Sequence, residues 1–160
     1  MQRGYSLVEV IVYVALLASL SVFVIGSVLS IYKAFAKTRI DRALSLNGTV
    51  AMETMIRETR QAISIDGAAS TFGTNPGTLA LGAKKFSLSG GAVTVQDGTN
   101  PAQDLTSGVT ATSLIFYRDT VASSEVSSDI VKIELTLEGG EGAFFRRITF
   151  FGSAVVRGAY

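Results

Sequence analysis

Glu9 is the residue of this chain with the clearest chemical potential, because it lies at the start of a long apolar stretch. From Leu7 to Tyr32 the groups that can ionise are Glu9 and two tyrosines. A carboxylate toward the centre of a bilayer costs on the order of 2 to 3 kcal/mol, and such residues usually mark function. The helix dipole reduces this cost near a helix N-terminus. Glu9 therefore predicts a site that would bind a positively charged partner.

Histidine and cysteine are absent from the sequence. The chain therefore cannot build a Ser-His-Asp triad, a Cys-His pair, an imidazole or thiolate metal site, or a disulfide. No GxSxG, Walker A or GxGxxG pattern occurs either. We expect a protein that is not an enzyme and that carries no cofactor.

The charge balance argues against nucleic acid as a partner. Fourteen basic and thirteen acidic residues give a net charge of +1, which is too balanced for sequence-independent binding to phosphates. Lys84-Lys85 and Arg146-Arg147 could touch DNA, but no aromatic stacking pattern accompanies them. Asp97, Asn100 and Asp104 could hold Ca²⁺ in a polar loop that lacks the EF-hand spacing. Solvated side chains are the favoured interpretation at both places.

The apolar stretch is long enough to span a membrane. About 24 apolar or small residues follow Glu9, and a bilayer needs about 20 in a helix. A secretory signal peptide would have a shorter apolar core and an Ala-x-Ala-like cleavage site. We therefore predict that residues 5–32 are retained as a transmembrane helix. A plain single-pass anchor is the alternative, and it leaves Glu9 unexplained.

The start of the chain resembles the type IV prepilin signature. Three features coincide: the short basic leader Met1-Gln2-Arg3-Gly4, the sequence Tyr5-Ser6-Leu7-Val8-Glu9, and the long apolar helix. In that family a prepilin peptidase cuts after the leader glycine and methylates the new N-terminal amine, and the fifth mature residue is Glu. The resemblance implies a leader at 1–4 with Arg3 as its basic residue, cleavage after Gly4, N-methylation of Tyr5, and an assembly role for Glu9.

The helical pattern continues beyond the apolar stretch. Ile40, Leu44, Ala51 and Met55 form one stripe, with Met52, Ile56 and Ile63 beside it. This predicts one helix over about residues 5–64, roughly 90 Å long, with Asn47-Gly48 as its weakest interior point. Residues 33–66 are then the amphipathic second half, which packs on the rest of the protein.

The composition changes at Asp66-Gly67 to one typical of strands. Residues 86–88 and 92–95 flank Ser89-Gly90-Gly91, which is a hairpin signal. Further strands are predicted at 78–81, 113–117, 130–137 and 143–151, with a turn at 138–142. Residues 67–160 should form one antiparallel sheet wrapped on the helix, which gives an α+β fold with a β-rich globular head.

The order of these elements resembles minor pilins and J-type pseudopilins of type II secretion. The resemblance implies a structural subunit in a type IV pilus or secretion pseudopilus, with a pilin-like fold. Its partners would be other subunits, through their N-terminal helices, the prepilin peptidase, the inner-membrane assembly platform and membrane lipid. The chain would cross the cytoplasmic membrane once with its N-terminus on the cytoplasmic side, and the head would be exported to the periplasm or the cell exterior, in a filament after assembly. The alternative is a membrane-anchored, exported binding module. Secretion, adhesion, motility and DNA uptake all remain open.

Overall fold

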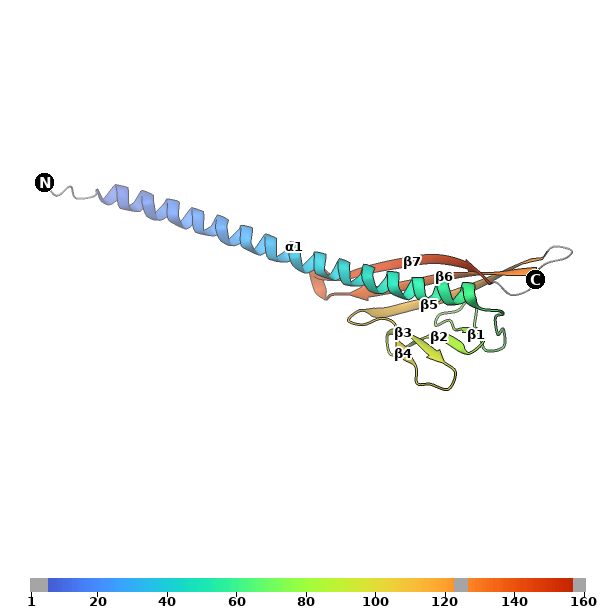
Figure 1. Ribbon diagram of the computed structural model, residues 1–160. Helices are drawn as coiled ribbons and strands as arrows, with labels where there is room; N and C mark the ends of the chain where they lie inside the picture. The colour runs from blue at the N-terminus through green and yellow to red at the C-terminus, as the bar shows by residue number, and fades with distance from the viewer. Residues whose placement is uncertain (1–5, 123–126, 157–160) are drawn as a thin grey trace. The chain divides into compact units, whose positions relative to one another are not determined.

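A computed structural model describes residues 6–122 and 127–156 of the chain (Figure 1). The chain divides into two compact units, Met1–Arg39 and Ile40–Tyr160. The helix α1 (Leu7–Gln61) begins in the first unit and ends in the second. The strands follow in chain order: β1 (Leu79–Leu81), β2 (Lys84–Ser89), β3 (Ala92–Asp97), β4 (Gln103–Asp104), β5 (Thr110–Ala122), β6 (Ser127–Gly139) and, after the 3-10 turn η1 (Gly142–Phe144), β7 (Arg146–Val155).

The long helix is confirmed, and it ends at Gln61 rather than near residue 64. Beyond the helix, the Asp66 carboxylate accepts hydrogen bonds from the backbone N–H groups of Ala68 and Ala69, at 3.0 and 3.1 Å. These bonds start a turn. Because the helix has already ended, the helical spacing no longer applies to Ile63. Its side chain is 83% exposed, so its predicted place beside the core stripe is wrong.

The rest of the predicted stripe packs against the sheets of the second unit. Leu44, Ala51 and Met55 are fully buried, and Ile40 and Ile56 are partly buried around them. Gly48 lies on the same face, where an added Cβ would meet the ring of Phe150. The predicted weak point of the helix is therefore a place where a side chain of the sheet packs closely on the helix backbone.

The strands form two antiparallel sheets, ordered β1-β2-β3-β4 and β5-β6-β7, so the prediction of a single sheet is wrong. The edge of β5 that could have joined them is occupied by the loop before β1. There the N–H groups of Gly73 and Gly77 donate to the carbonyl oxygens of Phe116 and Leu114 at 2.8 and 2.7 Å. A neighbouring strand therefore cannot pair along that stretch of β5, although β2 and β3 still contact it.

The predicted hairpin at Gly90-Gly91 is confirmed. Ser89 pairs with Ala92, and the two glycines between them have φ of 59° and 78°, as a tight type I′ turn requires. The turn between β6 and β7 is longer than predicted. Residues 142–144 form η1, so the last strand begins at Arg146 instead of residue 143.

Alternation along β5 and β6 separates a buried face from an exposed face. Leu114, Phe116, Ile133 and Leu135 are buried, and in Figure 1 the second half of α1 lies along this sheet. Toward the end of β5 and the start of β6, the Arg118 guanidinium donates two hydrogen bonds to the Asp129 carboxylate, at 3.0 and 2.8 Å. These bonds lower the pKa of Asp129, with help from the Thr120 hydroxyl, and raise that of Arg118.

Candidate assembly site

In residues 6–39 the first unit is a helix, and no other described element of that unit covers it. Its large apolar side chains are all exposed in residues 6–39, and Leu7 and Phe23 reach 77%. The segment is long and apolar enough to cross a membrane, by length and composition. An apolar surface of this extent needs lipid or other helices around it. The chain therefore carries a long N-terminal apolar helix that could be a membrane anchor or signal-like segment.

Three serines of this segment bond to the backbone of their own helix. Ser19, Ser21 and Ser27 donate to the backbone carbonyls four residues earlier, at 2.8, 2.8 and 2.9 Å. Such bonds let hydroxyl groups sit in hydrocarbon without an external partner. These three serines therefore need no hydrogen-bond partner on a second chain.

Glu9 differs from the serines because its group can carry a full charge. It lies in the first turn of α1, where the helix dipole favours a negative side chain. The Tyr13 hydroxyl donates a long hydrogen bond of 3.3 Å to Glu9 Oε1. Sequence reasoning missed Tyr13, although the spacing of four residues, which places two side chains on one helix face, was a usable signal.

The other predicted residues of this site lie outside the described residues. These are Arg3, Gly4 and Tyr5. The leader, the cleavage after Gly4 and the N-methylation of Tyr5 therefore stay predictions. Glu9 is the member of the predicted set whose surroundings are described.

The dibasic pairs of the head are largely engaged in ion pairs. Lys84 Nζ lies 2.6 Å from Glu58 Oε2, and the Glu58 side chain is only 14% exposed. Arg146 lies 3.5 Å from Asp41, and Arg147 pairs with Glu138. Pairing with carboxylates reduces what these cations could offer to a phosphate backbone.

The polar loop considered for Ca²⁺ is partly strand. Asp104 belongs to β4 and pairs with Thr94, while Asp97 ends β3 opposite Lys84. Within residues 6–122 and 127–156, no three acidic side chains gather closely enough to hold a metal ion.

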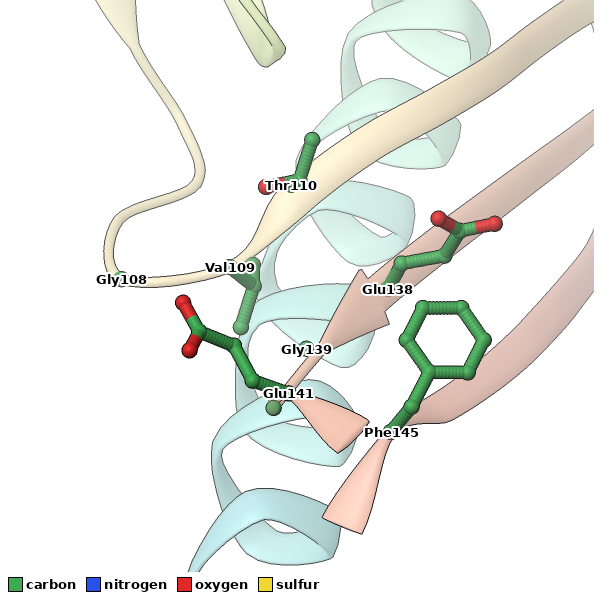
Figure 2. Close-up of a pocket in the computed structure, with 8 residues that line it drawn as sticks. Gly108, Val109, Thr110, Glu138, Gly139, Glu141 and Phe145 are labelled. Carbon is green, nitrogen blue, oxygen red and sulfur yellow. The ribbon is translucent and has the colours of Figure 1, made fainter. Parts of the chain in front are cut away.

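A hollow of about 560 Å³ lies beside the β6–β7 turn, and Figure 2 shows the residues that line it. The two carboxylates in it come from Glu138 and Glu141, and the ring of Phe145 lies next to Glu138. Glu138 is already paired with Arg147. The lining is completed by Gly108, Val109, Thr110, Gly139 and Gly140. This set offers no thiol, imidazole or amine to serve as a nucleophile or base.

Comparison with known proteins finds no family model, no curated protein and no solved structure that matches the chain.

Proposed function

We propose that this chain is a structural subunit of a type IV pilus or a type II secretion pseudopilus. In this proposal the first half of α1 anchors the subunit in the cytoplasmic membrane and later packs among the helices of neighbouring subunits. The second half carries the exported head. The chain performs no chemistry of its own, and the peptidase and assembly platform supply processing and energy.

The observation that carries this proposal is a carboxylate on an uncovered apolar helix. Lipid tails would cover the exposed apolar side chains, but they offer no partner to the charge of Glu9. Pairing with a neighbouring subunit's N-terminal ammonium would offset the desolvation cost of the Glu9 carboxylate and that of the ammonium. It would also fix the register between the two helices. The prepilin-like residues from Arg3 to Glu9 support the same partner.

The role of Glu9 is tested by Glu9→Leu and Glu9→Gln in full-length protein. A photo-crosslinking residue placed at the exposed Leu16 reports contacts between helices in cells that assemble the filament. Removing one member of a buried ion pair costs about 3–5 kcal/mol, so crosslinks should fall to background at equal membrane levels. The head makes no contact with Glu9 in this proposal, so its stability should not change.

A plain anchor gives the opposite outcome. Glu9→Leu would then improve membrane insertion and leave all contacts of the helix unchanged. Undiminished crosslinks in Glu9→Leu and Glu9→Gln would reject the assembly role. They would favour a membrane-anchored, exported binding module instead.

A further inference from the structure

Tyr13 is the side chain that hydrogen-bonds to Glu9 within residues 6–39. Its hydroxyl donates to Glu9 Oε1 at 3.3 Å, whereas the hydroxyls of Ser19, Ser21 and Ser27 donate to helix carbonyls. Tyr32, the other tyrosine of the apolar stretch, follows Glu9 by 23 residues, which is about 34 Å along a helix. It therefore cannot reach the carboxylate.

Helix geometry keeps the two groups together. Residues four apart lie on the same face, so Glu9 and Tyr13 are neighbours along α1. In hydrocarbon no water competes for either group, and a polar group without a partner is costly there. Both side chains therefore gain by turning toward each other, even though the bond is long.

The bond uses one of two carboxylate oxygens. Oε1 accepts from Tyr13, and in the described part of the chain no donor is recorded for Oε2. A carboxylate can accept hydrogen bonds at both oxygens. A bound Tyr13 therefore leaves Glu9 able to accept from a cation on another chain.

We propose that Tyr13 is a positioning residue for assembly. Its hydroxyl fixes Oε1 against the helix and thereby presents Oε2 to the ammonium of a second subunit. This inference rests on the proposed function, because it assigns Tyr13 a role only through Glu9. It explains why a phenol, and not a further aliphatic residue, stands one turn after the carboxylate.

Tyr13→Phe removes the hydroxyl and keeps the ring. With the photo-crosslinking residue at Leu16, the crosslinked fraction of full-length membrane protein should fall about fivefold, the size expected for losing one hydrogen bond of ordinary strength, because this bond is long at 3.3 Å. Tyr32→Phe is the matched control and should behave as wild type. Total membrane protein should be unchanged in both variants, since each still fits an apolar helix.

Glu9→Asp separates positioning from packing. The shorter side chain keeps the charge but no longer reaches Tyr13, so crosslinking should fall to an intermediate level. Adding Tyr13→Phe to Glu9→Asp should then have no further effect, because interacting groups do not act independently. A purely structural role of the phenol predicts the same further loss in both backgrounds.

The results distinguish this inference from the proposed function. If Glu9→Gln abolishes crosslinks and Tyr13→Phe leaves them at the wild-type level, the positioning role is wrong and the assembly role stands. If Glu9→Gln has no effect, both are wrong. A loss of Tyr13→Phe protein from the membrane, or a further loss in the Glu9→Asp background, would also overturn the positioning role.

Discussion

Gly48→Ala should destabilise the head, although alanine is the better helix former. In an unhindered helix this change gains about 1 kcal/mol. Here the added methyl group would overlap three atoms of the Phe150 ring, which packs directly on the helix backbone. Overpacking of this kind costs about 1–3 kcal/mol. Because the whole ring must move, we expect an overpacking cost in the upper part of that range. The net loss of unfolding free energy should then be about 1–2 kcal/mol.

Urea unfolding of a fragment that begins at Lys33 measures this loss. The urea midpoint should fall while the dependence on urea concentration stays the same, since the surface exposed on unfolding does not change. The matched test is Phe150→Leu, which shortens the side chain that Gly48 faces. In that background Gly48→Ala should cost less by about 1 kcal/mol or more.

Two results would refute this reasoning. One is a Gly48→Ala head that is more stable by the full helix-propensity gain. The other is an equal cost with Phe150 and with Leu at position 150. Either would mean that the sheet does not approach α1 at Gly48.

Two further predictions concern the head alone. The lowered pKa of Asp129, caused by Arg118, stabilises the folded state above the unfolded-state value of about 3.9, and that stability disappears as pH falls through the lowered value. The melting temperature of wild type should therefore drop more steeply than that of Asp129→Asn between about pH 5 and pH 2; parallel curves would contradict this. A fragment from Lys33 should be soluble and monomeric, whereas one from Gly67 lacks the buried Leu44 and Met55 and should aggregate; a well-folded Gly67 fragment would contradict the core assignment.

The helix and its buried stripe could be predicted because spacing alone sets which residues share a helix face. Leu44, Ala51, Met52 and Met55 were found in this way. The end of the helix was missed by a few residues, because the apolar spacing continues to Ile63 although the helix has already ended at Gln61. For that reason Ile63 was predicted to lie beside the core, although it is exposed.

The split into two sheets depends on contacts that spacing does not record. It follows from the loop at Gly73 and Gly77, whose N–H groups occupy the edge of β5 more than 35 residues later in the chain. The ion pair between Glu58 and Lys84, which are 26 residues apart in the sequence, also cannot be seen in the pattern, because Glu58 looks like one more charge on a solvated helix face.

At the candidate site, composition pointed to Glu9 because one charge in an apolar run stands out. Tyr13 did not stand out, since an aromatic residue fits an apolar helix without explanation. Its role depends on the direction of a hydroxyl, which the residue type does not give.

The central claim is that the chain is a processed filament subunit, and the intact mass of the membrane-extracted protein tests it most directly. In cells with an active prepilin peptidase, we predict a mature chain that begins at N-methylated Tyr5. The unprocessed chain should persist in peptidase-deficient cells and when Gly4 is replaced by a bulky residue. Protein that keeps Met1 to Gly4 in peptidase-positive cells would contradict the account.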